Sequence, residues 1–99
     1  MEDMLERILI KEVDNIDRIH MFYSETADRW AAFQQSALNL AEIIPELVGT
    51  TTNQLFVDGE VKLTCIIINS EYMELHGLPF HCTLLGDDYM ELQKTPVPE

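Results

Sequence analysis

The chain has 99 residues, of which eighteen are Asp or Glu and six are Lys or Arg, so its formal net charge is -12. Its length allows one domain, and a hydrophobic fraction of 46% excludes intrinsic disorder. No apolar run is long enough to span a membrane. Six cations are too few to bind nucleic acid directly or to hold an anionic membrane surface. The partner that this charge favours is a protein with a basic surface.

The negative charge is distributed along the whole chain. Residues 1–48 hold ten acids and four bases, and residues 49–99 hold eight acids and two bases, so each half carries -6. The first residues are acidic where a secretory signal peptide would be basic, which favours a cytoplasmic protein. In that compartment we expect Cys65 and Cys82 to be reduced thiols.

The N-terminal region has the hydrophobic spacing of a helix. Residues 1–44 contain no Gly and no Pro, and apolar side chains recur there at alternating intervals of three and four. This spacing predicts a helical segment over residues 1–48 that ends at Pro45 and Gly49 and resembles a coiled-coil seam. Ser24 could cap a second helix, so one kinked helix and two helices both remain open. The seam includes Ile16, Ile19, Tyr23, Trp30, Phe33 and Leu40.

A helix of that length would extend beyond a small domain. At about 1.5 Å per residue, 44 residues span roughly 65 Å. The apolar stripe therefore serves either as core against the C-terminal half or as a contact between copies of the chain, and we expect a homo-oligomer.

The C-terminal half has the two-residue period of strands. Alternation begins near Asn53, and Asp58-Gly59 is a strong hairpin signal. The expected strands are residues 53–57, 60–68, 71–76, 79–85 and 88–93, followed by a flexible tail at 95–99. The predicted fold class is α+β: a long N-terminal helical segment, then a five-strand antiparallel meander or small open barrel, together one domain. The strand at 60–68 is apolar on both faces, so one face needs the helix or another molecule to cover it.

Two segments of this half repeat each other. Residues 65–75 align without gaps on residues 82–92, with five identities that include a shared Tyr-Met-Glu-Leu. The repeat predicts two copies of strand, turn and strand. Duplication and convergence on hairpin chemistry explain it equally well.

Residues 55–93 resemble Sm-like small β-barrels. Residues 61–66 with 71–75 look like the first Sm motif, and residues 84–89 look like the second. The resemblance implies a barrel, ring oligomers and, usually, RNA contacts. Cys65 stands where the family has Gly, and Glu74 where the family has an RNA-contacting polar residue. Leu85 stands where the family has a basic amino acid. Direct RNA binding is therefore not expected.

No catalytic or metal-binding motif is present. Cys65, His76, His81 and Cys82 are ligand types for zinc, but they lack the spacing that places two ligands on one face. Cysteine or serine beside a positioned histidine is also missing, as is a phosphate-binding loop. We expect no enzyme activity, no cofactor and no metal.

The function that remains is a small acidic protein-interaction module, such as an inhibitor, adaptor or chaperone. It would dock on a basic protein surface, and its charge could mimic that of nucleic acid. The alternative is a self-assembling structural subunit with an Sm-like barrel. The acidic residues expected at the partner face, unless they only solubilise the sheet, are Glu60, Glu71, Glu74, Asp87, Asp88 and Glu91.

Overall fold

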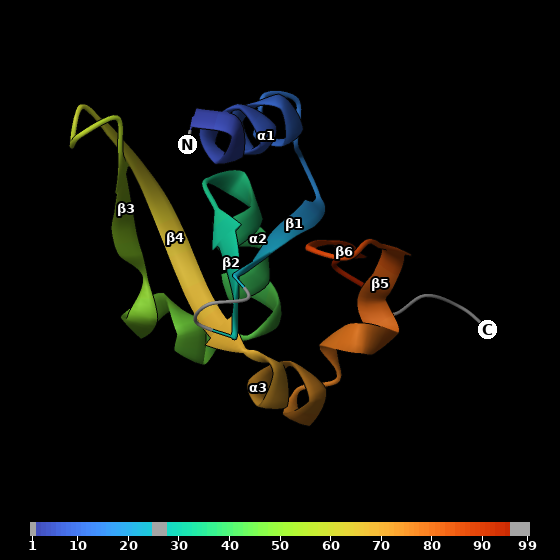
Figure 1. The fold of residues 1–99 in the computed structure, drawn as a ribbon. Coiled ribbons are helices and arrows are strands. Elements are labelled where there is room, and N and C mark those ends of the chain that lie inside the picture. The colour runs from blue at the N-terminus through green and yellow to red at the C-terminus, as the bar shows by residue number, and fades with distance from the viewer. Residues whose placement is uncertain (1, 25–27, 96–99) are drawn as a thin grey trace.

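The computed structural model describes residues 2–24 and 28–95, with side chains from residue 5 onward. Along the chain, each helical segment is followed by two strands, and Figure 1 shows their arrangement. The helices are α1 (Glu2–Glu12), α2 (Gln35–Ile43) and α3 (Ser70–Leu75), and the 3-10 turns are η1 (Pro45–Thr50) and η2 (Leu78–His81). The strands are β1 (Arg18–Ser24), β2 (Arg29–Phe33), β3 (Thr52–Phe56), β4 (Val61–Asn69), β5 (Cys82–Leu85) and β6 (Tyr89–Gln93).

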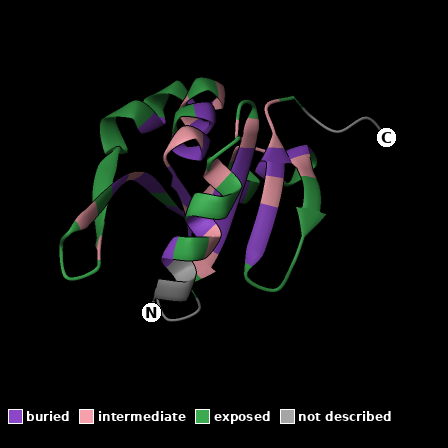
Figure 2. Cartoon of the chain, turned by 90° about the horizontal axis from the view of Figure 1, so that it is seen from above, coloured by how far each residue is buried: buried purple, intermediate pink, exposed green. Residues whose placement is uncertain are grey.

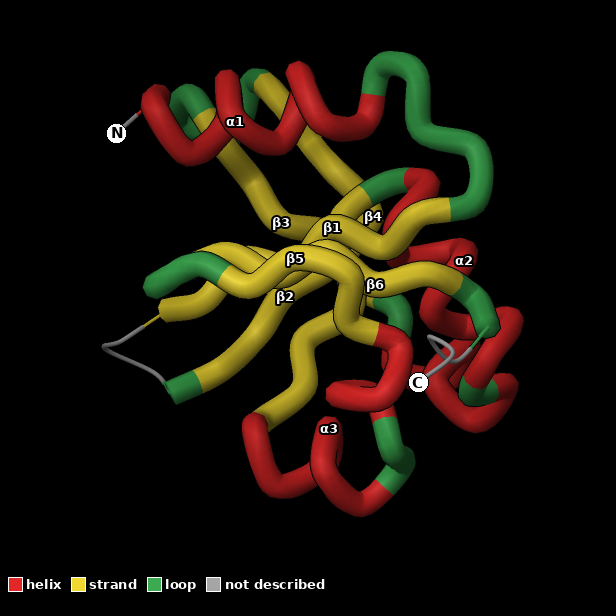
Figure 3. Tube along the Cα trace, turned by 90° about the vertical axis from the view of Figure 1, so that its right-hand side faces the viewer, coloured by secondary structure: helices red, strands yellow, loops and turns green. Residues whose placement is uncertain are grey.

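The six strands form one antiparallel sheet in the order β3-β4-β2-β1-β6-β5. Figure 3 shows the sheet as a central layer, with α1 on one side and α3 on the other. Because successive strand residues point to opposite sides, each strand contributes to both layers of core. We call the side that α1 covers the α1 face and the opposite side the α2 face.

The α2 face is closed by α2, η1, α3 and η2. Apolar side chains of four strands pack there against those helices as one cluster. Its fully buried members are Ile19, Met21, Ala32, Leu40, Ile66, Leu78 and Leu92.

The α1 face is covered only in part. Leu5 and Ile8 of α1 pack on a smaller cluster from the strands. Ile67, on the same face of β4, keeps 39% of its surface exposed. In Figure 2 the two edge strands, β3 and β5, are mostly exposed while β1 and β6 are mostly buried. The strand members of the α1-face cluster are Phe22, Phe33, Leu63, Cys65 and Tyr89.

The long N-terminal helix predicted over residues 1–48 is wrong. The helix α1 ends at Glu12, and the next two elements are the strands β1 and β2. Because β1 lies in the middle of the sheet and is buried on both faces, its apolar run does not alternate and can imitate helical spacing. Asn15 turns the chain before β1, since its Oδ1 accepts a hydrogen bond from the backbone N–H of Arg18 at 3.0 Å.

The predicted apolar stripe is divided among different parts of the fold. Ile16 lies between α1 and β1 and is 80% exposed. Phe33 belongs to the α1-face cluster. The other stripe residues, Ile19, Tyr23, Trp30 and Leu40, belong to or pack against the α2-face cluster. The helix start proposed at Ser24 would continue into residues 25–27, which lie outside the described residues.

The five-strand meander is also wrong, because β1 and β2 lie between β4 and β6 in the sheet. Four of the five expected strands correspond to β3, β4, β5 and β6, but residues 71–76 lie mostly in α3. Asn69 starts this helix, since its Oδ1 accepts a hydrogen bond from the backbone N–H of Tyr72 at 2.7 Å. The shared Tyr-Met-Glu-Leu is therefore helix at 72–75 and strand at 89–92. Of the tail expected at 95–99, only Thr95 lies within the described residues.

Candidate functional site

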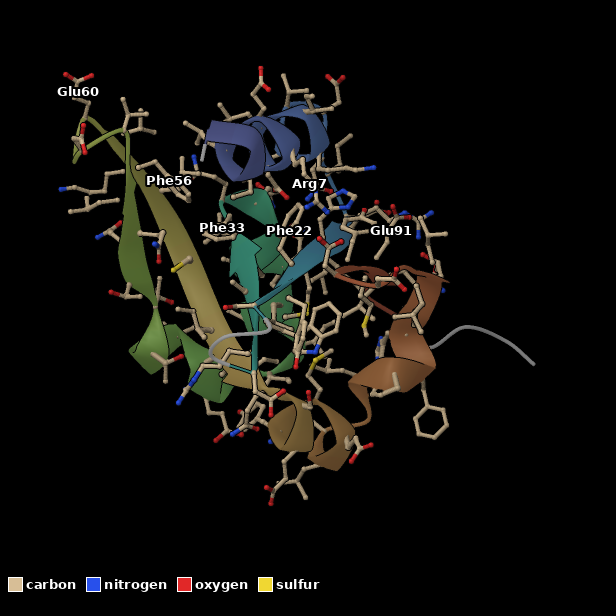
Figure 4. The ribbon with its side chains drawn as sticks, viewed as in Figure 1. Arg7, Phe22, Phe33, Phe56, Glu60 and Glu91 are labelled. Carbon is tan, nitrogen blue, oxygen red and sulfur yellow. The ribbon has the colours of Figure 1, made fainter. Side chains whose placement is uncertain are left out.

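The candidate site is a groove on the α1 face, next to the part that α1 covers. Its volume is about 290 Å³. Figure 4 shows three of its aromatic side chains, Phe22, Phe33 and Phe56, in a row beneath α1. Four neighbouring strands supply the lining, which consists of Phe22, Tyr23, Ser24, Arg29, Ala31, Phe33, Gln54, Phe56 and Ile67.

The sheet register explains why a hollow forms here. Ala31 lies between Phe22 on β1 and Ile67 on β4, as their paired neighbour on both sides. A methyl group between larger side chains leaves space above the sheet. Aromatic rings border that space, with ring centroids 6.2 Å apart for Phe22 and Phe33 and 6.0 Å apart for Phe33 and Phe56.

The chemistry of the groove is apolar with a few polar groups at its margin. Among the residues that the structure describes, Arg29 is the one charged residue in the lining, and the neutral polar residues include Ser24 and Gln54. Small-molecule pockets range from about 300 to 1,000 Å³, so this groove holds a few side chains rather than a large cofactor. Such a surface binds apolar groups and orients them with a small number of polar contacts.

Arg7 holds α1 beside the groove. Its guanidinium donates two hydrogen bonds to the carboxylate of Asp88, at 3.1 and 3.2 Å, and lies 5.3 Å from the centre of the Phe22 ring. The same hydrogen bonds hold the pKa of Asp88 below its ordinary value. The Lys11 ammonium lies 4.9 Å from the centre of the Tyr89 ring. Sequence reasoning assigned no role to either cation.

A polar cluster fixes the C-terminal end of α1. The Glu12 carboxylate accepts hydrogen bonds from the backbone N–H of Ser36 at 2.9 Å and from its hydroxyl at 2.5 Å. The Ser36 hydroxyl oxygen in turn accepts from the backbone N–H of His20 at 2.8 Å. Glu12 therefore joins α1 to β1 and α2.

Beside this cluster, His20 and Tyr89 link β1 to β6. Nδ1 of His20 lies 2.6 Å from the hydroxyl of Tyr89, which donates to Oε1 of Glu91 at 3.3 Å. Burial lowers the pKa of His20, and burial together with Glu91 raises the pKa of Tyr89. Both rings are neutral and buried, so this chain of hydrogen bonds fastens two strands.

The six acidic residues expected at one partner face are not brought together. Glu60 lies in the turn between β3 and β4, and Figure 4 shows it far from Glu91. Asp88 is paired with Arg7 and Glu91 with Tyr89. The remaining three are divided between α3, which carries Glu71 and Glu74, and the turn between β5 and β6, which carries Asp87.

The thiols and imidazoles do not form a metal site within the described residues, because no group of three or more His, Cys, Asp or Glu there could hold an ion. Cys65 is a free, buried thiol, and its burial raises its pKa. Cys82 is a free, half-buried thiol. Among the described helices, none combines the length and the apolar composition needed to cross a membrane.

The fold and site together define a small α+β domain with an open apolar groove. Comparison with protein-family models, curated proteins and solved structures finds no match to this chain.

Sequence reasoning missed the groove because it placed Phe22 and Phe33 on a helix. One signal was available: Trp30-Ala31-Ala32-Phe33 sets two small residues between two large ones, and on a strand one of the alanines must lie on each face. That Ala31 lies between Phe22 and Ile67 could be identified only once the strand order was known.

Proposed function

We propose that this chain is a small acidic, non-enzymatic protein-interaction module that docks on a partner with a basic surface and holds an apolar segment of that partner in the groove. The observation that carries the proposal is an aromatic-lined hollow of about 290 Å³ on a chain of net charge -12. An inhibitor, an adaptor and a chaperone would all use such a site.

The groove supplies the apolar part of binding. Phe22, Phe33 and Phe56 present ring surface, and Ile67 adds an aliphatic side chain that is already 39% exposed. Covering such surface is favourable by about 25 cal/mol per Å². Aromatic and aliphatic side chains of a partner fit this lining better than polar ones do.

The charge supplies attraction and orientation. Exposed carboxylates follow one end of the groove in the chain: Asp58 and Glu60 come after Phe56 in the hairpin turn. Lys and Arg that flank an apolar segment would meet these groups. Long-range attraction of this kind raises the association rate and weakens with salt.

Selection of random dodecapeptides against the purified chain tests the proposal. We expect the enriched peptides to combine Lys or Arg with aromatic or branched aliphatic residues. Ile67→Asp should weaken their affinity roughly tenfold or more, since it places a charge in an apolar contact. Salt at about 0.5 M, roughly three times the physiological level, should weaken it as well.

Leu55→Asp is the matched control. Leu55 lies on the same hairpin and is 55% exposed, but alternation places it on the opposite face from the groove residues Gln54 and Phe56. Equal losses in the two variants would remove the groove from the binding site. Affinity that does not change with salt would contradict the electrostatic part.

Self-assembly is the second candidate, and exposed aliphatic residues favour it. Leu9, Ile10 and Val13 on and beside α1 are 44%, 71% and 75% exposed. The edge strands β3 and β5 each pair on one side only among the described residues. Sedimentation of the purified chain tests this candidate: a monomer at micromolar concentration contradicts it, and an oligomer that Ile10→Glu dissociates supports it.

A further inference from the structure

We infer that the groove receives the C-terminal end of the partner, with the terminal carboxylate on Arg29 and the last side chains on the aromatic lining. The inference rests on the proposed function and adds a direction and a terminal group to it. The carrying observation is the position of Arg29, which lines the groove and also a neighbouring hollow of about 230 Å³.

Arg29 is a cation without an acidic partner among the described residues, in a chain where acids outnumber bases three to one. Arg7 pairs with Asp88 and Lys94 with Glu42. The carboxylate nearest to Arg29 in sequence is Asp28, and its Oδ1 accepts the hydroxyl proton of Tyr23 at 2.5 Å. The guanidinium of Arg29 is therefore available to an anion from outside.

Asn69 adds a second donor in the neighbouring hollow, outside the groove lining. It is the β4 neighbour of Arg29 in the sheet register, and it lines the adjoining hollow together with Arg29. Its Oδ1 is already used by the backbone N–H of Tyr72. What Asn69 offers a ligand is therefore its amide N–H₂ group, which like a guanidinium binds acceptors.

No carboxylate among the described residues lines either hollow, whereas carboxylates lie at the hairpin tip beyond Phe56. The site therefore has hydrogen-bond donors at the Arg29 end and an apolar lining between Arg29 and Phe56. Acidic residues follow Phe56, at the opposite end. A basic partner must supply one anion for the first of these regions. Every polypeptide carries one at its C-terminus whatever its composition, and the fork of an arginine matches a carboxylate with two hydrogen bonds. The segment would then run from Arg29 towards Phe56, with its Lys or Arg residues at Asp58 and Glu60.

Two peptide libraries with the same randomised heptapeptide test the inference, one displayed with a free C-terminus and the other followed by a fixed carrier. Enrichment from the free-terminus library alone supports it. Comparable enrichment from both libraries overturns the C-terminal inference and leaves the proposed function standing. Enrichment from neither overturns both. Decanoate binding that depends on Arg29, with no library enriched, would assign the groove to small carboxylates instead.

Synthetic peptides from the selection then identify the contact. Amidation of the C-terminus should weaken binding about tenfold or more, because it removes a charge-assisted hydrogen-bond pair. In Arg29→Gln the acid and the amide should bind alike, and Arg29→Lys should restore part of the difference. Lys62→Gln is the matched control, since Lys62 is also an exposed strand cation but lies outside the groove lining. A preference for the free acid that persists in Arg29→Gln would overturn the inference.

Discussion

The two faces of the sheet differ in how completely helices cover them. The α2 face is closed by α2, η1, α3 and η2, and its cluster contains side chains with no exposed surface on both strands and helices. The α1 face has one helix of eleven residues, and the rest of that face carries the groove. We infer from this difference that the α2 face stabilises the fold, whereas the α1 face leaves surface for a partner.

The means of attachment also differ between the faces. On the α2 face, burial of apolar surface dominates, as at Leu40 and Ile66, which are fully buried. On the α1 face, the part of α1 whose side chains are described contributes two buried side chains, Leu5 and Ile8. It relies further on polar contacts such as the one between Glu12 and Ser36. Hydrogen bonds and ion pairs contribute less net free energy than apolar burial of this extent.

The largest effect is expected from a cavity in the α2 face. Leu40→Ala should lower the free energy of unfolding by about 3 kcal/mol, since it removes a fully buried side chain. Leu38→Ala, on the same helix at 55% exposure, should change it by about 0.5 kcal/mol or less. Urea unfolding of both variants measures the difference. Equal losses would show that α2 is not a core element of this face.

The sequence predicted much of the C-terminal half because alternation there is local. One example is β4, whose alternate residues belong to different core clusters. Another is the turn at Asp58-Gly59, which joins β3 to β4. The N-terminal half was mispredicted because its strands lie in the middle of the sheet. An apolar run with no exposed face loses the two-residue period that identifies a strand.

The repeated Tyr-Met-Glu-Leu shows the limit of local pattern most clearly. In α3 it follows Asn69, which caps the helix, whereas in β6 it pairs with β1 and β5. Four identical residues therefore adopt different secondary structures according to a cap and to pairing across the sheet. The groove could not be predicted for the same reason, since its lining comes from strands whose order depends on long-range pairing.

The second prediction concerns the polar attachment of α1. Ser36→Ala should lower the free energy of unfolding by about 2 kcal/mol, because Oε2 of Glu12 and the backbone N–H of His20 lose the Ser36 hydroxyl as a partner. Hydrogen exchange should accelerate in α1 more than in α3, which covers the α2 face. The exposed Ser70→Ala serves as the control and should have little effect. Hydrogen exchange that accelerates equally in α1 and in every strand would contradict the expectation that α1 is attached less stably than the elements of the α2 face.

The third prediction is a loss of stability with falling pH that originates at His20. Burial lowers the pKa of His20 below its ordinary value of 6.5, against the raising influence of Glu12 and Glu91, while Lys11 and Arg18 lower it further. The unfolded chain therefore binds the proton first, so stability declines as pH falls from about 6.5 towards the folded-state pKa. Thermal unfolding between pH 7.5 and 5 measures the decline.

His20→Gln should flatten this dependence, even though it lowers stability at pH 7.5 by removing the contact with Tyr89. His76→Gln, at the C-terminal end of α3, is the matched substitution of a half-buried histidine. If the slope persists without His20, the decline comes from other groups and His20 is not held neutral by the fold.

The smallest effect is expected from Arg7→Gln. The pair with Asp88 is 42% and 55% exposed, so its loss should cost about 0.5 kcal/mol, and less in high salt. The lowered pKa of Asp88 gives the sign with pH: the contribution is present above the ordinary pKa of 3.8 and is lost as pH falls through the folded value. Urea unfolding at low and high salt measures the cost, with Lys62→Gln as the control for removal of one positive charge. A cost above about 2 kcal/mol would mean that one surface contact anchors α1, and the α1 face would then contribute to stability far more than the comparison of the two faces allows.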